Sequence, residues 1–209
     1  METIKKGSKC AAVKILQSAL HLSQDGIFGS ITEEAVRDFQ RNNGLKDDGI
    51  VGETTWKKIL DTKGNIQTVL KTSKRKITEI FIHCSATREG QDYTIEDIRK
   101  WHKQRGFNDI GYHYVIYRDG TIHNGRDVDL VGAHCEGHNS HSIGVCYIGG
   151  CKNDGVTPKD TRTNAQKTSL LSLLKDLRRK YPFAKIRGHN EVAKKACPSF
   201  IVKNEYQNI

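Results

Sequence analysis

The sequence of 209 residues contains no continuous run of about 18 apolar residues, so it predicts no membrane-spanning helix. Its first ten residues are polar and basic, and they lack the apolar core of a secretory signal peptide. We therefore expect the protein to be made in the cytoplasm. A target outside the cytoplasm then requires another route of delivery.

The six cysteines include no pair with CxxC spacing, which disfavours a zinc ribbon or a thioredoxin-type motif. Without a signal peptide, we expect the thiols to be made reduced. Whether Cys146 and Cys151 pair depends on how close the backbone brings them, and their spacing leaves this open.

Acidic residues are outnumbered, and the net charge is +10. Residues 62–76 contain five basic residues and no acidic one. Excess positive charge attracts polyanions, which include both nucleic acids and the carboxylate- and phosphate-bearing bacterial cell wall, or it serves solubility alone. The sequence contains no RRM, zinc-finger or recognition-helix signature, so we expect no specific nucleic-acid partner.

An internal repeat marks the N-terminal part of the chain. The segment Asp25–Thr32 recurs 23 residues later as Asp48–Thr55, and each copy begins with an Asp-Gly turn before a helix. In the first copy, Ser30 and Glu33 fit a capping box. The helix that follows would bury one face, formed by Ile31, Ala35, Val36 and Phe39. We expect a small all-α domain of three helices over residues 1–62, followed by a basic linker over residues 63–76.

From Ile77 onward, strands alternate with helices, which indicates an α/β domain over residues 77–209. The expected strands cover residues 77–83, 112–117, 121–123, 143–148 and 184–187. The expected helices cover residues 94–105, with Thr94 and Asp97 forming a capping box, and 163–180, ended by Pro182.

Three side chains in this domain are of the types that bind zinc. His83 ends the first expected strand, His189 follows the last one, and Cys197 comes eight residues later. Two imidazoles and a thiolate suit a catalytic zinc site that keeps one position for water. Cys84 cannot join His83 as a ligand in a regular strand, because adjacent side chains point to opposite faces. The alternative is that these residues are core or surface histidines and a buried structural thiol.

The same region resembles the phage-lysozyme type of zinc amidase, a family related to the peptidoglycan recognition proteins. The resemblance covers nearly all of residues 77–203 and is carried by five segments in order: Ile80–Thr87, Ile98–Lys103, Gly111–Ile116 with Arg118-Asp119-Gly120, Ser142–Cys146 and Gly188–Phe200. It implies a mixed central β-sheet flanked by helices. It also implies zinc-dependent hydrolysis of the amide bond between N-acetylmuramic acid and L-alanine in peptidoglycan.

Individual roles follow from the resemblance. It implies that His83, His189 and Cys197 bind Zn²⁺, and that Tyr112 and Lys195 belong to the active site. His134 matches a position near the family's substrate cleft, so we assign it to substrate binding. Members that only bind peptidoglycan typically lack the cysteine ligand, which this chain keeps.

The chemistry of amide hydrolysis is consistent with these residues. Lys195 can stabilise the oxyanion of the tetrahedral intermediate. Tyr112 can orient water or donate to the intermediate, and the sequence does not decide between these roles. Glu191 is a conceivable general base. We expect His113 to pack or hydrogen-bond, and His123, His138 and His141 to be loop or surface residues.

The N-terminal domain resembles the peptidoglycan-binding domain 1 family, through its Asp-Gly-x-x-Gly repeats and following helices. This implies a tether that raises the local substrate concentration, although a stability or partner module is an alternative. We expect a monomeric endolysin that reaches the cell wall through holin-mediated release. The competing hypotheses are a peptidoglycan-binding protein without catalysis and a nucleic-acid or polymerase partner.

Overall fold

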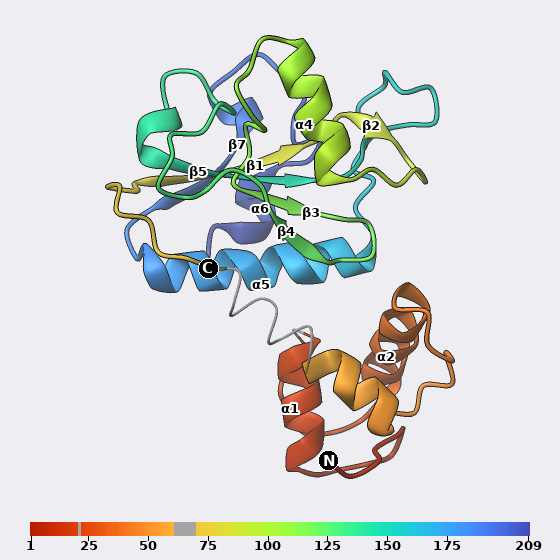
Figure 1. Ribbon diagram of the computed structural model, residues 1–209. Coiled ribbons are helices and arrows are strands. Elements are labelled where there is room, and N and C mark those ends of the chain that lie inside the picture. The colour runs from red at the N-terminus through yellow and green to blue at the C-terminus, as the bar shows by residue number, and fades with distance from the viewer. Residues whose placement is uncertain (21, 61–69) are drawn as a thin grey trace. The chain divides into compact units, whose positions relative to one another are not determined.

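The computed structural model describes residues 1–20, 22–60 and 70–209 (Figure 1). The chain divides into two compact units, Met1–Thr68 and Val69–Ile209. Within the described residues, no helix is both long and apolar enough to cross a membrane.

The first unit contains the expected helices. These are α1 (Ala11–Ala19), α2 (Ser30–Asn42) and a helical segment at residues 53–60. Their apolar faces surround one small core, formed by Ile4, Val13, Leu16, Leu20, Phe28, Val36, Val51, Trp56 and Ile59. The small all-α domain is therefore present as predicted.

Two details at the start of α2 differ from the prediction. The N-cap is Gly29, and no side chain caps this end, so the capping box expected from Ser30 and Glu33 is absent. Ser30 is already the first helical residue, whereas a capping hydroxyl must come from the residue before the helix. Ile31, expected on the buried face, is 76% exposed, while Val36 is buried.

The repeat has a structural basis that the sequence analysis missed. Gln17 accepts a hydrogen bond from the Gly26 amide at 2.9 Å and donates to Asp25 Oδ1 and the Ile27 carbonyl. Gln40, 23 residues later, makes the same contacts with Gly49, Asp48 and Ile50. Both glycines have positive φ, at +78° and +73°. A buried glutamine thus closes each turn by satisfying backbone groups that would otherwise lack partners.

The second unit is built on a five-stranded sheet in the order β4-β3-β5-β1-β7. Strand β3 pairs antiparallel with β4 and parallel with β5, and β1 lies parallel to both β5 and β7, so the sheet is mixed as predicted. The elements are β1 (Glu79–Cys84), β2 (Thr87–Arg88), α4 (Ile95–Gln104), β3 (Tyr114–Ile116), β4 (Ile122–Asn124), η1 (Asn139–His141), β5 (Ser142–Tyr147), β6 (Gly150–Cys151), α5 (Asn164–Lys180), β7 (Lys185–Gly188), η2 (His189–Glu191) and α6 (Val202–Tyr206).

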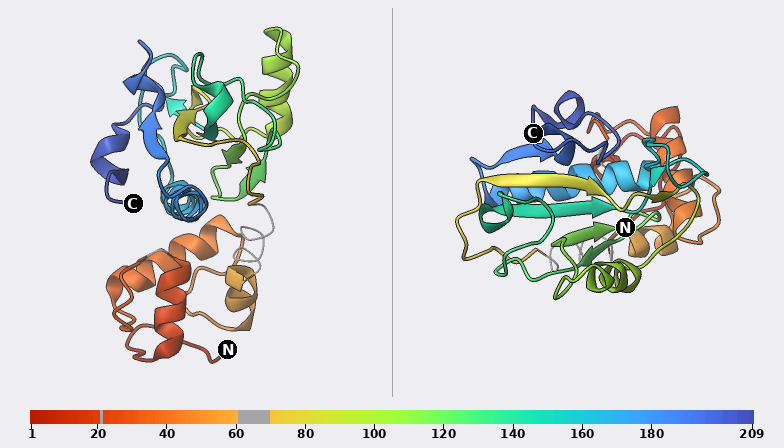
Figure 2. Two further views of the ribbon diagram at one scale, coloured as in Figure 1. Left: turned by 90° about the vertical axis from the view of Figure 1, so that its left-hand side faces the viewer. Right: turned by 90° about the horizontal axis from the view of Figure 1, so that it is seen from above.

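Helices cover both faces of this sheet (Figures 1 and 2). Leucines of α5 pack against Ile80 and Ile82 of β1 on one face. On the other face, Ile98 of α4 packs with Val115 and Cys146. Because side chains alternate along a strand, Phe81 and His83 of β1 lie on the α4 face. The capping boxes at Thr94 and at Thr163, the N-caps of α4 and α5, fix where both helices begin.

Strand β3 is shorter than expected, and part of the expected linker packs on the second unit. Strand β3 begins at Tyr114, so Tyr112 precedes it, although the His113 amide still donates to the Gly144 carbonyl. Residues 63–69 of the expected linker lie outside the described residues. Residues 70–76 lie against the second unit: the Ser73 amide donates to the Tyr181 hydroxyl at 2.7 Å, and the Ser73 hydroxyl donates to the Val128 carbonyl.

Candidate metal centre

Strand pairing brings the two predicted histidine ligands together. Strands β1 and β7 are parallel neighbours in which Ile82 is opposite Gly188. Each of these two residues is followed by a histidine: His83, the last but one residue of β1, and His189, the first residue of η2. Their ring centroids are 4.6 Å apart. The sheet register therefore sets this pair, which is more than a hundred residues apart in the sequence.

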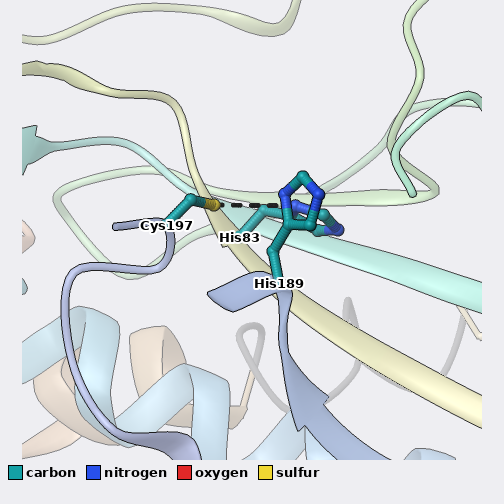
Figure 3. A group of neighbouring side chains, drawn as sticks. All are labelled: His83, His189 and Cys197. Carbon is teal, nitrogen blue, oxygen red and sulfur yellow. Dashed lines mark hydrogen bonds between the residues drawn. The ribbon is translucent and has the colours of Figure 1, made fainter. Parts of the chain in front are cut away.

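The loop after η2 brings the third predicted ligand to the same point. Cys197 Sγ lies 3.6 Å from His83 Nδ1 (Figure 3). One nitrogen from each of His83 and His189 and the sulfur of Cys197 all lie within 4.8 Å of one another. The Asn190 amide, which donates to the Cys197 carbonyl at 2.7 Å, fixes this loop. Two nitrogens and one sulfur at this separation fit the donor set of a catalytic zinc site.

Electrostatics keep the histidine pair in its ligand form. His83 is 1% exposed and His189 is 8% exposed. Burial lowers the pKa of His83 well below 6.5, with His134, His189 and Lys195 adding to the effect. Burial and then Lys195 lower the pKa of His189. Both imidazoles are therefore neutral at pH 7, and each retains a lone pair for a metal.

The sulfur of Cys197 receives support from the backbone. The Cys84 amide donates a hydrogen bond to Cys197 Sγ at 3.3 Å. The Cys84 thiol and burial raise the pKa of Cys197, whereas this N–H group opposes them by favouring the thiolate, which is the form that binds metal. The Cys84 side chain itself lies with the α5-side core, as its alternation with His83 predicts.

His134, predicted as a substrate-binding residue, contacts one of the proposed ligands. Its Nδ1 atom lies 3.1 Å from His83 Nε2, which leaves His83 Nδ1 directed at Cys197. Its Nε2 atom lies 3.4 Å from the Ser142 hydroxyl, which in turn donates to the His138 carbonyl. His134 is 8% exposed. The imidazole thus orients the ring of His83 while one edge borders an open cavity.

That cavity is beside the proposed metal ligands and has a volume of about 620 Å³. Its lining includes Phe107, His134, Glu136, Asn139, His189 and Lys195. Lys195 is exposed, so its ammonium group is available to a bound molecule. A mixed polar and apolar cavity beside a metal site is the arrangement that a substrate cleft requires.

Tyr112 is next to the same histidine but is not part of the cavity lining. Its ring centroid lies 5.1 Å from that of His83 and 5.2 Å from that of His102. Burial raises the pKa of Tyr112 well above 10, with Cys146 and Cys197 adding to the effect. The phenol is therefore protonated at neutral pH and acts as a hydrogen-bond donor.

The other polar residues singled out in the sequence have local partners. Glu191 accepts a hydrogen bond from the Gly188 amide at 2.7 Å and pairs with Arg187. His113 is fully buried, and its Nδ1 accepts from the Gly144 amide while its Nε2 contacts the Leu130 carbonyl. His138 and His141 were expected to be loop or surface residues. Both lie at the short helix η1 in the segment before β5 and are partly exposed, and both contact the carboxylate of Glu79.

Comparison with known proteins gives two family matches. The N-acetylmuramoyl-L-alanine amidase family matches residues 73–200, and a peptidoglycan binding domain family matches residues 11–59. Among curated relatives, the endolysin of Klebsiella phage KP32 is 46% identical over 136 residues, covering 65% of this chain and 89% of the relative. The endolysin of Escherichia phage T7 is 49% identical over 128 residues, covering 61% of this chain and 84% of the relative.

Solved structures show the same fold. The N-acetylmuramoyl-L-alanine amidase LysC from Clostridium intestinale is 32% identical, with a TM-score of 0.52 over 64% of this chain and 87% of that one. The peptidoglycan recognition protein PGRP-SA of the bumblebee is 22% identical, with a TM-score of 0.54 over 66% of this chain and 88% of that one. At that identity, the second likeness concerns the fold alone.

Proposed function

The chain belongs to the N-acetylmuramoyl-L-alanine amidase family, and we propose that it works as a zinc-dependent endolysin through His83, His189 and Cys197. As a member of this family it is an enzyme, and it hydrolyses the amide bond between N-acetylmuramic acid and L-alanine of bacterial peptidoglycan. Its close likeness to phage endolysins supports cell-wall lysis as the biological role.

The observation that carries the zinc proposal is the convergence of three ligand atoms within 4.8 Å. Zinc, when bound, supplies Lewis-acid chemistry that polarises the scissile carbonyl and makes water an effective nucleophile near neutral pH. The chain contributes two neutral imidazoles and the sulfur of Cys197, which accepts a hydrogen bond from the Cys84 amide. Three protein ligands leave one position of a tetrahedral site for the reaction.

Lys195 and Tyr112 are the proposed catalytic residues. The ammonium group of Lys195 borders the cavity and can neutralise negative charge on the carbonyl oxygen of the tetrahedral intermediate. The protonated phenol of Tyr112, next to His83, can donate to that intermediate or orient the attacking water. Both roles of Tyr112 act in the chemical step, so loss of the phenol should lower kcat with little effect on KM.

His134 has two parts in this proposal. Its position in the cavity lining supports a contact with substrate. Its contact with His83 supports a second role in orienting that ligand, because a histidine bound to metal through one nitrogen usually donates from the other.

The N-terminal unit is proposed to hold the enzyme on its polymeric substrate. The match of residues 11–59 to a peptidoglycan binding domain supports this. Tethering raises the local concentration of cleavable bonds and adds nothing to the chemical step. We further propose domains at residues 1–62 and 77–209, a monomeric protein, and delivery to the wall by holin-type release.

Digestion of purified sacculi tests the function directly. Mass spectrometry of the products should show free L-alanine N-termini and intact glycan strands, and a chelator should abolish both the release and the lysis. Cys197→Ser should bind sacculi and release nothing. Full release by metal-free protein would overturn the zinc proposal, and cleavage within the glycan would overturn the assigned reaction.

A competing function is peptidoglycan binding without catalysis. It predicts that sacculi are bound and that no new L-alanine termini form. The presence of Cys197 and Tyr112 beside the histidine pair, with Lys195 in the lining of the adjoining cavity, favours hydrolysis.

A further inference from the structure

A second group of metal-binding side chains lies outside the site described above. Glu79 begins β1, His138 is the N-cap of the short helix η1, and His141 is the last residue of that helix. Glu79 Oε2 lies 2.6 Å from His138 Nδ1 and 3.1 Å from His141 Nε2. One ligand atom from each residue lies within 4.8 Å of the other two, as in the first group. None of these three residues takes part in the proposed reaction.

The donor set suits a borderline divalent cation. Two imidazole nitrogens and one carboxylate oxygen bind Zn²⁺ at about 2.0–2.2 Å, which places neighbouring ligand atoms about 3.3 Å apart in a tetrahedral site. The distances from Glu79 Oε2 to the two histidine nitrogens would have to change by less than about 1 Å to reach this tetrahedral spacing. The protons now shared between the carboxylate and the two rings would be displaced by the cation.

The two carboxylate oxygens of Glu79 have different partners. Oε1 lies 2.7 Å from the Arg187 guanidinium, whereas Oε2 hydrogen-bonds only to the two histidines within the described part of the chain. Burial alone would raise the pKa of Glu79, but hydrogen bonds from His138 and Arg187 and their charges lower it below 4.5. The carboxylate is thus ionised, and Arg187 leaves one oxygen available for a metal.

The cluster is accessible, and one of its histidines has an outer partner. The side chains of His138 and His141 are 29% and 38% exposed, so a cation can enter and water can complete its coordination. The Nδ1 atom of His141 lies 3.1 Å from the Ser140 hydroxyl. Such a contact on the nitrogen opposite the metal fixes the ring orientation of a ligand.

The cluster is separate from the first site. Glu79 and His83 are four residues apart on one face of β1, which is about 13 Å along a strand. The ring of Phe81 lies between them, 5.2 Å from the His138 ring and 6.4 Å from the His83 ring. Metals that act jointly on one substrate lie about 3.5–4 Å apart, so two cations here would act independently.

We propose that Glu79, His138 and His141 form a second zinc-class metal site, which cross-links the start of β1 to the segment that precedes β5. This segment includes Glu136 and Asn139, which line the cavity beside His189. A metal at the second site therefore stabilises one wall of the cavity without taking part in hydrolysis.

Zinc counting on the full chain tests the proposal. Protein equilibrated with buffered micromolar free Zn²⁺ should hold two equivalents by atomic emission, and His141→Asn and His138→Asn should each hold one. Cys197→Ser should also hold one equivalent of zinc. The double variant with Cys197→Ser and His141→Asn should hold none. His123→Asn is the matched control, because this histidine of β4 stacks on Tyr117 outside the cluster, and the variant should hold two equivalents.

A second measurement separates loss of the site from loss of folding. In the Cys197→Ser background, Zn²⁺ should raise Tm, and adding His141→Asn should abolish the rise while leaving the far-ultraviolet circular dichroism unchanged. A single equivalent in the unmodified chain that Cys197→Ser removes would overturn the proposal. So would a second equivalent that survives the combined replacement of His138 and His141. Neither result depends on lytic activity, so the assigned function stands or falls separately.

Discussion

His83 Nε2 lies 3.1 Å from His134 Nδ1, and this contact directs the other nitrogen of His83 toward Cys197. The side chain of one proposed ligand is therefore held by a residue that the sequence analysis assigned to substrate binding. Partners of this kind fix the tautomer and ring orientation of a metal ligand.

Replacing His134 with alanine should weaken zinc binding at the first site by about 10–100-fold, because the ring of His83 loses its orienting partner. His134→Asn should restore part of the affinity, since its side-chain amide can reach the position of Nδ1. Zinc competition with a chromophoric chelator measures both. An affinity unchanged in His134→Ala would restrict this residue to substrate binding.

Cys197→Ser should reduce both zinc retention and amide hydrolysis by more than about 100-fold, because it removes the thiolate ligand. Binding to sacculi should persist, since residues 11–59 are unchanged. Cys10→Ser in the first unit is the control and should behave as the unmodified protein. Retained hydrolysis in metal-free Cys197→Ser would refute the proposed mechanism.

Lys195→Met should lower kcat by about 10²–10³-fold with little change in KM, because it removes charge stabilisation that develops in the transition state. Zinc content should stay the same. Lys194→Met, an exposed neighbour outside the cavity lining, is the matched control. A change confined to KM would instead make Lys195 a substrate-binding residue.

Acid should destabilise the second unit through His113. Burial lowers its pKa from 6.5 to about 4, so between these values the unfolded chain binds the additional proton. The stability contributed by the neutral ring is complete above about pH 6.5 and is lost as the pH falls toward 4. The full loss from this one group is about 3 kcal/mol, at a slope of about 1.4 kcal/mol per pH unit.

Urea unfolding at a series of pH values measures this effect. A Trp56→Phe background leaves Trp101 as the sole tryptophan, which reports on the second unit. His113→Gln should reduce the slope of unfolding free energy against pH by the amount expected for one proton. It should also lower the stability at pH 7. An unchanged slope would show that His113 is not the group that takes up the proton.

Gln17→Leu and Gln40→Leu should each destabilise the first unit, by about 1–3 kcal/mol, because buried turn groups lose their hydrogen bonds. The two costs should be similar, since the two networks match contact for contact. Trp56 fluorescence during urea unfolding reports on this unit. Glu34→Gln, on an exposed site of α2, is the control, and an equally large effect there would contradict the assignment.

Local signals in the sequence determined much of this protein. The 23-residue repeat predicted the turns and helices of the first unit, and the capping box at Thr94 predicted one helix start. His83 and His189 were placed at strand ends by hydrophobic patterning, and the structure shows that the strands carrying them are neighbours. These features depend on residues within a few positions of one another, which is why a sequence reveals them.

Only the tertiary structure decided which distant side chains share a point in space. Gln17 and Gln40 had no local signal, because their turn partners are eight to ten residues away. The pairing of Glu79 with His138 and His141 depends on a loop folding back on β1, some sixty residues away in sequence. Strand register and loop closure set such contacts, since the free energy that fixes them comes from packing of the whole unit rather than from any one segment.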